Sequence, residues 1–437
     1  DQTGFLQNRY INENNVITCE VLEDAKKNDK LGLMMAIDFS KAFDCLSHRF
    51  IRDALKHFGF GKSFISYINT LITDFQAAVM HAGNLSEFFK LERGAKQGDP
   101  IAALLFIIAV EILSIRLKED PDIEHYKLGD AIVKLILYAD DLNLFMEYSE
   151  KSLRKAIQIL EEFKEMSGLE VQVKKTQIVL LGRKYVEEIH KLAPDINVKW
   201  SQQFRLLGLD YDAYNEDNMV VNYENKLDEI FDEMSSWRTK FISIRARKNV
   251  VTGLFLSKLT HIAAVLPTLP KKEIKKIERR LYDFIWGGGA AKLEREEAKL
   301  TFETGGMNFP DLFSAWEALK IPWIRRIEIG LTTMWYDILE HKIKEVNRNL
   351  ELSKITSWSS HTVDTVTRKI SSRIWKSIFK SLQSYIKKDT KIHPERALKL
   401  NMWGMGSLKN NQGKKIGISK VKSLEKHNIL PVQLMHI

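Results

Sequence analysis

Residues 133–146 of the chain read VKLILYADDLNLFM, and this stretch decides the fold. Two mostly apolar runs, Val133 to Leu137 and Leu142 to Met146, flank an acidic tip formed by Tyr138, Ala139, Asp140 and Asp141. Short apolar runs on either side of a tight polar tip are typical of two strands joined in a β-hairpin. The stretch therefore predicts a hairpin that holds two carboxylates at its exposed end.

The paired acids of this tip have two interpretations. No Lys or Arg lies in the tip itself, so Asp140 and Asp141 repel one another unless a proton or a metal ion intervenes. An Asp-Asp pair is also typical of an ordinary polar turn, because Asp tolerates turn geometry. The hairpin alone leaves both interpretations open.

Composition limits the class of protein. A chain of 437 residues with 44% hydrophobic and 28% charged residues has room for two to four folded domains. Cys19 and Cys45 lack histidines at zinc-site spacing, so we expect a reducing compartment, the nucleus and/or the cytoplasm. The longest uninterrupted apolar run, Ile101 to Val110, is too short to cross a bilayer, and we expect no membrane partner.

Charge is distributed unevenly along the chain. Residues 1–200 carry 26 Lys and Arg against 30 Asp and Glu, whereas residues 201–437 carry 40 against 27. An acidic half suited to cations and a basic half suited to phosphates are typical of an enzyme that acts on nucleic acid. A solvated basic surface would have the same composition.

The pattern of apolar residues predicts an α+β first half. We expect an exposed amphipathic helix in the first thirty residues and a buried strand at Leu31 to Phe39. The remaining expected elements are helices at Ser47 to Phe58, Lys62 to Ile72, Pro100 to Lys118 and Glu150 to Ser167, a strand pair at Gln76–His81 and Glu87–Leu91, the hairpin, and strands at Gln177–Leu181 and Phe204–Leu209. This order suits a ferredoxin-like split-βαβ core with an antiparallel sheet.

Beyond about residue 215 long helical patterns replace the strands. They cover about Asn222–Trp237, Lys248–Val265 and Lys271–Trp286, and three glycines follow them. We place domain boundaries near residues 215 and 290. The expected domains are residues 1–215, residues 216–290 and a basic region of unknown role at residues 291–437.

A third acid is placed to join the hairpin. Asp38 ends the strand that begins at Leu31, where it either caps the following turn or faces a metal ion. In the expected core this strand lies beside the hairpin, so Asp38, Asp140 and Asp141 would converge. Clustered carboxylates favour hard divalent ions such as Mg²⁺, which completes its shell with substrate phosphates.

Five motifs in order now resemble those of reverse transcriptases. They are Asp38 with Phe43, residues 96–100 (KQGDP), residues 138–141 (YADD), residues 167–169 with 175–176 (SGL and KT), and residues 204–208 (FRLLG). Residues 2–5 (QTGF), 284–287 (FIWG) and 301–326 are similar to the non-LTR, LINE-type retrotransposon enzymes. The resemblance covers about residues 2–330.

The resemblance implies a palm with partial fingers at residues 1–215 and a basic helical thumb at residues 216–290. It implies catalysis by Asp38, Asp140 and Asp141, which with the Phe39 carbonyl would hold two Mg²⁺ ions, with Mn²⁺ able to substitute. Further implied contacts are Phe43, Gln97, Gly98 and Lys175 to the nucleotide, Leu207 and Gly208 to the primer, and Arg238, Lys240, Arg245, Arg247 and Lys248 to nucleic acid.

The implied reaction is RNA-directed synthesis of DNA, with an RNA template, a DNA primer or target and dNTPs as partners. Because the chain begins with Asp1, we expect the family's upstream fingers and endonuclease to lie outside it. The alternative is a truncated, inactive retroelement remnant that only binds nucleic acid. Departures from the family pattern, such as Ala102 and Ala103 after the KQGDP turn, favour that alternative. An RNA-directed RNA polymerase is disfavoured by Phe43, since its ring would clash with a ribonucleotide.

Overall fold

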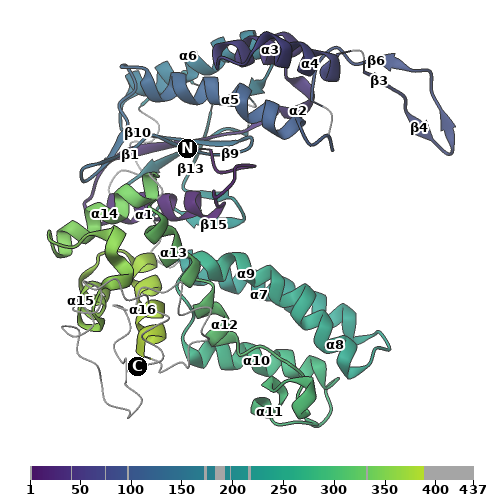
Figure 1. Cartoon of the computed structure of the whole chain (residues 1–437), viewed down its shortest axis with the longest axis vertical. Helices are drawn as coiled ribbons and strands as arrows, with labels where there is room; N and C mark the ends of the chain where they lie inside the picture. Colours follow the sequence, from purple (N-terminus) through teal and green to yellow (C-terminus); the bar gives the residue numbers. More distant parts are fainter. Residues whose placement is uncertain are drawn as a thin grey trace, which may run out of the picture. The chain divides into compact units, whose positions relative to one another are not determined.

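Strand β1 (Gly32–Ile37) is the centre of a five-stranded sheet with the order β13-β12-β1-β10-β9 (Figure 1). In this computed structural model β1 pairs antiparallel with β10 (Asp141–Glu147) and with β12 (Gln177–Leu181). Strand β9 (Leu135–Tyr138) pairs with β10 and confirms the predicted hairpin. Most of β1 is buried, which explains its continuous apolar run in place of an alternating pattern.

The edge of this sheet differs from the prediction of an all-antiparallel arrangement. Strand β13 (Lys199–Ser201), which the sequence pattern did not indicate, pairs parallel with β12. Two parallel strands need a crossover of a dozen or more residues, and residues 182–198 provide a connection of that length.

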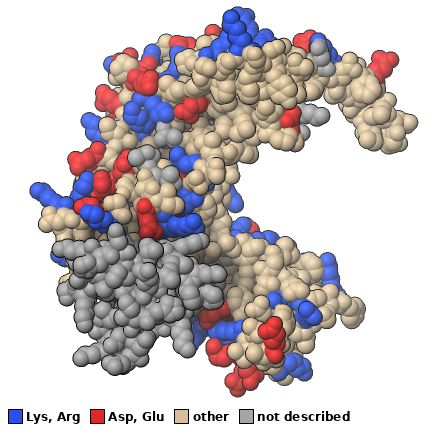
Figure 2. Space-filling view, viewed as in Figure 1, with Lys and Arg blue, Asp and Glu red and all other residues tan. Residues whose placement is uncertain are grey.

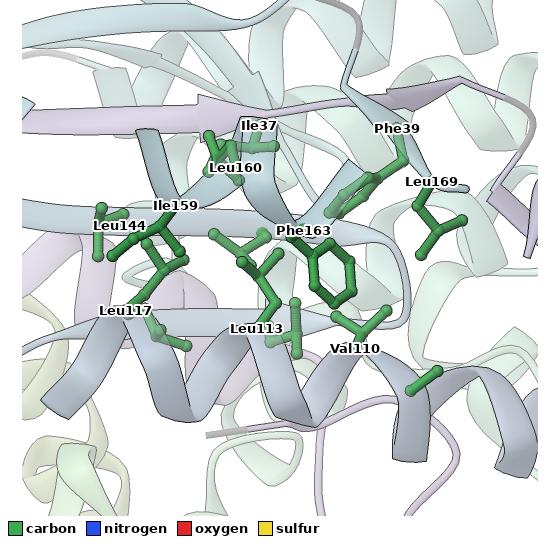
Figure 3. Packing of buried hydrophobic residues seen from close by; sticks show 14 of the residues in the cluster. Ile37, Phe39, Val110, Leu113, Leu117, Leu144, Ile159, Leu160, Phe163 and Leu169 are labelled. Carbon is green, nitrogen blue, oxygen red and sulfur yellow. The ribbon is translucent and has the colours of Figure 1, made fainter. Parts of the chain in front are cut away.

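Helices α5 (Ala102–Glu119) and α6 (Glu150–Ser167) supply most of the apolar packing beside the sheet (Figure 3). Val110, Leu113 and Phe163 from these helices and Leu144 from β10 are all fully buried. Helix α6 begins where the Ser149 side chain accepts a hydrogen bond from the Ser152 N–H, and it ends at Gly168. These bounds agree with the predicted range, Glu150 to Ser167.

Helix α1 (Asn12–Lys27) corrects the prediction of an exposed helix. Almost every residue of its first three turns is buried, and it contacts β9 and β12. Its polar side chains have partners inside the protein: the Tyr211 hydroxyl donates to Asn15 Oδ1 at 2.9 Å, and Asn14 Nδ2 donates to the Leu137 carbonyl at 3.2 Å. A helix whose Asn side chains are buried and hydrogen-bonded has the same polar sequence pattern as a helix whose Asn side chains face solvent. The pattern therefore does not distinguish the two.

Two further predictions of strands change in detail. The expected pair at residues 76–91 consists of β3 (Gln76–Ala77) with β6 (Phe89–Lys90) and β4 (Met80–His81) with β5 (Asn84–Leu85). The single strand expected at residues 204–209 is a hairpin of β14 (Gln203–Leu206) and β15 (Leu209–Asp212). Leu207 and Gly208 form its turn with φ of 45° and 83°, as a two-residue type I′ turn requires.

The remaining elements up to residue 212 are short or cover the core. They are β2 (Phe39–Ser40), α2 (Ala42–Cys45), α3 (His48–His57), α4 (Lys62–Ile72), β7 (Tyr126–Leu128), β8 (Ala131–Val133) and β11 (Glu170–Val171). Helices α3 and α4 agree with the predicted ranges to within a residue or two.

From residue 218 onward the described chain is helical. Its elements are α7 (Asn218–Arg238), α8 (Ile244–Val250), α9 (Leu256–Val265), α10 (Lys271–Ile285), α11 (Arg295–Lys299), α12 (Leu312–Ala318), α13 (Ile321–Ile329), α14 (Met334–Val346), α15 (Ser360–Lys369) and α16 (Arg373–Lys387), with short 3₁₀ turns at Phe302–Thr304 and Leu352–Ser357. The helix expected at residues 248–265 is interrupted by a π-helical turn, Val251–Phe255.

Three tryptophans and one lysine form the centre of this helical part. Trp323, Trp335 and Trp375 are fully buried, with ring centroids 5.4–5.7 Å apart. The Lys320 ammonium is also buried and donates to Thr268 Oγ1 at 2.7 Å and to the Ala263 carbonyl at 3.0 Å. Burial lowers the pKa of Lys320 to about 8, because the charged form loses its hydration.

The structure describes residues 2–40, 42–73, 75–95, 98–171, 175–182, 192–196, 198–214, 218–330 and 333–387. The chain divides into two compact units, Asp1–Glu216 and Asp217–Ile437. Within the described ranges, no helix has the length and apolar character needed to span a bilayer.

Candidate active site

The register of the sheet brings the three predicted acids to one end of neighbouring strands. Ile37 of β1 pairs with Leu142 of β10, so the next residue of one strand, Asp38, faces the preceding residue of the other, Asp141. Asp140 lies in the turn directly before β10. Acids that lie a hundred residues apart in the sequence thus converge, because β1 ends beside the point where β10 begins.

The turn that carries Asp140 has a tight and unusual backbone. Tyr138 pairs with Asp141, so only Ala139 and Asp140 form the loop between the strands. Ala139 has φ of 54°, a conformation that residues with a Cβ seldom adopt. Such a residue costs about 1–3 kcal/mol and persists where its surroundings hold it in place.

The acids interact electrostatically. The pKa of Asp141 is raised to about 6, first because nearby protein desolvates its carboxyl group, and then because Asp140 and Asp38 repel a further negative charge. Asp141 as a whole residue is nevertheless exposed, so solvent still reaches part of it. A cation bound beside these carboxylates would favour their charged forms.

Lys175 supplies a positive charge at the same strand ends. Gln177 of β12 pairs with Ala36 of β1, which places Lys175 level with Asp38. Its Nζ lies 3.5 Å from Asp38 Oδ2, and both side chains remain 66% and 44% exposed. An exposed ion pair of this kind contributes about 0–1 kcal/mol, so it is easily exchanged for another partner.

The donor chemistry of this cluster fits a hard divalent ion, although its geometry is not that of a closed metal cage. Among the side chains that the structure describes, no group of three or more His, Cys, Asp or Glu is gathered closely enough to hold a metal ion. Mutual repulsion keeps uncompensated carboxylates apart, and the Lys175 ammonium lies by one of them. Carboxylate oxygens are the ligands that Mg²⁺ prefers, and it takes few of them from protein.

Comparison with known proteins matches the part of the chain that carries these acids to a family. A family model described as reverse transcriptase (RNA-dependent DNA polymerase) matches residues 1–211. The Pol polyprotein of the type-2 retrotransposable element R2DM of Drosophila melanogaster is 33% identical over 174 residues, which are 40% of this chain and 16% of that protein. Residues 1–211 match the reverse transcriptase family, and the retrotransposon relatives support a domain of the non-LTR type.

Other relatives extend beyond this reverse transcriptase domain. An uncharacterized 149 kDa protein of transposon TX1 from Xenopus laevis is 26% identical over 291 residues, 66% of this chain and 22% of that protein. The chain thus spans about a fifth of the length of these curated relatives. A telomerase structure from Candida tropicalis covers 75% of this chain and 51% of its own, at 12% identity and a TM-score of 0.36, a likeness too distant to define the fold.

Phe39 directly follows Asp38 in the chain, and Phe43 lies five residues after Asp38. Phe39 is buried in β2, where it pairs with Val171 of β11. The ring of Phe43 is half-buried and stacks on Phe106 at a centroid distance of 4.5 Å. Phe43 therefore packs partly on the core and keeps part of its surface open to solvent.

Three of the other sequence-predicted contacts of the domain, Gly98, Leu207 and Gly208, lie on turns. Gly98 is exposed with φ of 87°, and a Cβ there would meet nothing within 4 Å. Gln97 lies outside the described residues. Leu207 and Gly208 form the tip of the β14–β15 hairpin, with Leu207 half-buried and Gly208 exposed.

The five basic residues predicted to contact nucleic acid, which lie in the second unit, have different surroundings. Arg238, Lys240 and Arg245 are exposed, near the junction of α7 and α8. Arg247 donates to the carbonyls of Ile242 and Phe284, at 3.3 and 3.1 Å, and Lys248 is 8% exposed with its ammonium over the Phe302 ring. The structure thus gives Arg247 and Lys248 internal contacts that the sequence did not indicate.

Figure 2 adds that the basic surface is not continuous. On the face in view, acidic side chains lie among the basic ones in the second unit. On this face the basic side chains do not form one continuous stripe.

The acidic turn is surrounded by a set of residues that no sequence pattern indicates as site residues. Gln2, Thr3 and Asn14 hydrogen-bond the backbone at Leu137 and Ala139. The QTGF motif at residues 2–5 belongs to the family resemblance, and nothing in its composition indicates a contact 137 residues away in the chain.

Proposed function

We propose that the chain is the polymerase portion of a non-LTR retrotransposon and synthesises DNA on an RNA template. The observation that carries this proposal is the convergence of Asp38, Asp140 and Asp141 at the ends of β1 and β10, inside a domain of the reverse transcriptase family. We further propose that residues 1–215 act as palm with partial fingers, residues 216–290 as thumb, and that the chain works in the nucleus or cytoplasm.

The proposed reaction joins a primer 3′-hydroxyl to the α-phosphate of a dNTP, with pyrophosphate as the leaving group. Asp38, Asp140 and Asp141, with the Phe39 carbonyl, would hold two Mg²⁺ ions, which stabilise the charge on the attacking and leaving oxygens. The polypeptide itself positions the primer end and the triphosphate. Lys175, exposed beside Asp38, is placed to offer its ammonium to a phosphate once that carboxylate has a cation.

A primer-extension assay tests the assignment directly. The chain, an RNA template, a DNA primer, dNTPs and Mg²⁺ should give extended products. Excess EDTA should stop the reaction, and Mn²⁺ should restore it. Binding of primer and template without any extension would favour the inactive remnant instead.

Phe43 is proposed to select deoxynucleotides. Its half-buried ring lies five residues after Asp38 and is held against Phe106, so its exposed edge is fixed in position. Replacing Phe43 by Val should increase the ratio of ribonucleotide to deoxynucleotide incorporation about tenfold or more, since the 2′-hydroxyl then meets less bulk. Steady-state kinetics with each nucleotide measure this ratio, with Phe50→Val as an aromatic-to-aliphatic control. An unchanged ratio would make Phe43 a packing residue.

The junction of α7 and α8 is proposed to hold the nucleic acid by its phosphates. Arg238, Lys240 and Arg245 are exposed there, and no Asp or Glu occurs between Glu233 and Glu273. Phe241 between them is fully exposed and is suited to stack on a base. Phosphate contacts position a nucleic acid without distinguishing its sequence.

Changing Arg238, Lys240 and Arg245 together to Gln should weaken binding and flatten its salt dependence. Each lost phosphate contact lowers the slope of log K against log salt by about 0.9 on a DNA duplex, so the slope should fall by up to about 3. Fluorescence anisotropy at several salt concentrations measures it. The control variant changes three exposed basic residues of α6, Lys151, Arg154 and Lys164, to Gln and so removes the same charge. Its slope of log K against log salt should stay closer to that of wild type. Equal losses of affinity and slope in both variants would show a general effect of net charge and would contradict a binding role for the α7–α8 junction.

A further inference from the structure

The start of the chain is bonded to the turn that carries the acids. Gln2 is only 5% exposed, and its Oε1 accepts hydrogen bonds from the Ala139 N–H at 2.9 Å and from the Gly4 N–H at 2.7 Å. Its Nε2 donates to the Ala139 carbonyl at 3.5 Å. One side-chain amide thus contacts both backbone polar groups of Ala139, the N–H and the carbonyl.

Thr3 and Asn14 bind the backbone of Leu137, two residues before Ala139. The backbone N–H and the hydroxyl of Thr3 both donate to the Leu137 carbonyl, at 2.8 and 3.0 Å. Asn14 Nδ2 of α1 donates to that carbonyl as well, at 3.2 Å. The last residues of β9 before the turn are therefore fixed by two separate segments of the chain.

Gly4 is required here for space. A Cβ at this position would lie 2.7 Å from the Ala139 backbone nitrogen, closer than real Cβ atoms approach such an atom. The φ of Gly4 is not positive, so its lack of a side chain serves close approach to the turn.

We infer that Gln2 is a positioning residue, which fixes Ala139 in its left-handed conformation and so sets the directions of the Asp140 and Asp141 carboxylates. This inference rests on the proposed polymerase function for its effect on catalysis, and on the hydrogen bonds alone for its effect on the turn. Gln suits this place because its neutral amide satisfies an N–H and a carbonyl. A Glu would add negative charge beside acids that already repel one another.

The first test measures the turn itself. Hydrogen exchange at the Ala139 amide should be about tenfold faster or more in Gln2→Leu, which keeps the bulk of the side chain and removes its polar atoms. Gln2→Glu keeps an acceptor and should retain the protection. Gln158→Leu, at an exposed position of α6, is the control and should exchange as wild type at Ala139. Unchanged exchange in Gln2→Leu would overturn the inference.

The second test measures the acids. Gln2→Leu should weaken Mn²⁺ binding about 10–100-fold in a titration of the unreacted protein, the loss typical when an outer partner of a metal ligand is removed. In primer extension kcat should fall by a similar factor, with KM for the primer–template nearly unchanged. Wild-type affinity and kcat in Gln2→Leu would refute the positioning role.

A second variant covers the case in which Gln2→Leu does not fold. Gly4→Ala should disturb the same turn by steric contact, with faster exchange at Ala139 and weaker Mn²⁺ binding. Gly61→Ala is its matched control, because a Cβ at Gly61 meets nothing within 4 Å. If both glycine variants resemble wild type, the inference fails. If wild-type protein lacks polymerase activity and the exchange results hold, the proposed function fails. The role of Gln2 in fixing the turn then still stands.

Discussion

Replacing Asp140 and Asp141 together by Asn abolishes primer extension on an RNA template, with an expected loss of about a thousandfold or more. In many enzymes the largest single contribution to the rate enhancement comes from charged or polar groups that face the reacting atoms. Losing one such group alone lowers kcat by about 10²–10³-fold. Here two carboxylates that would hold the catalytic ions lose their charge together. Steady-state extension with each protein at matched concentration measures the loss.

The same substitution should leave folding intact. The pKa of Asp141 is raised, so the fold disfavours its charged form, and a neutral amide of similar shape relieves that repulsion. We therefore expect unchanged or slightly higher stability in thermal unfolding at neutral pH. Glu161→Gln with Glu165→Gln removes two exposed acids of α6 and should keep full activity. Equal incorporation by wild type and the Asp140→Asn/Asp141→Asn protein would refute the assignment of the acids.

Phe163→Ala should have the largest effect on stability among the core residues beside the sheet. Its ring on α6 lies among the buried residues of the core (Figure 3). It packs edge-on against Phe50 at a centroid distance of 5.4 Å. Truncating a buried Phe costs about 3–5 kcal/mol, from lost burial and from the cavity that remains. Chemical denaturation followed by circular dichroism measures this loss in free energy of unfolding.

The control is a phenylalanine that the fold does not bury. Phe88, near β6, is 67% exposed, and Phe88→Ala should change the free energy of unfolding by no more than about 0.5 kcal/mol. A loss below about 1 kcal/mol in Phe163→Ala would mean that the helix α6 is not packed on this core.

Local patterns determined most of the elements that carry the site. The apolar runs around YADD predicted the hairpin of β9 and β10, and the run ending at Asp38 predicted β1. The range predicted for the helix at Glu150 to Ser167 matches α6. These features depend on neighbouring residues in the chain, through hydrophobic periodicity and helix capping, so the sequence alone contains the information.

Features that depend on distant partners could not be predicted in this way. The polar residues of α1 indicated an exposed helix, and only the tertiary structure provides the buried groups that satisfy them. The parallel pairing of β13 and the internal contacts of Arg247 also depend on residues far away in the sequence, so no local pattern indicates them.

The sequence by itself predicted which three acids come together and which strands carry them. The tertiary structure decided how they are held, since the amide of Gln2 meets Ala139 across 137 residues. A hydrogen bond between residues so far apart leaves no periodicity or spacing in the chain. It exists only after β1, β9 and β10 have set the strand ends side by side.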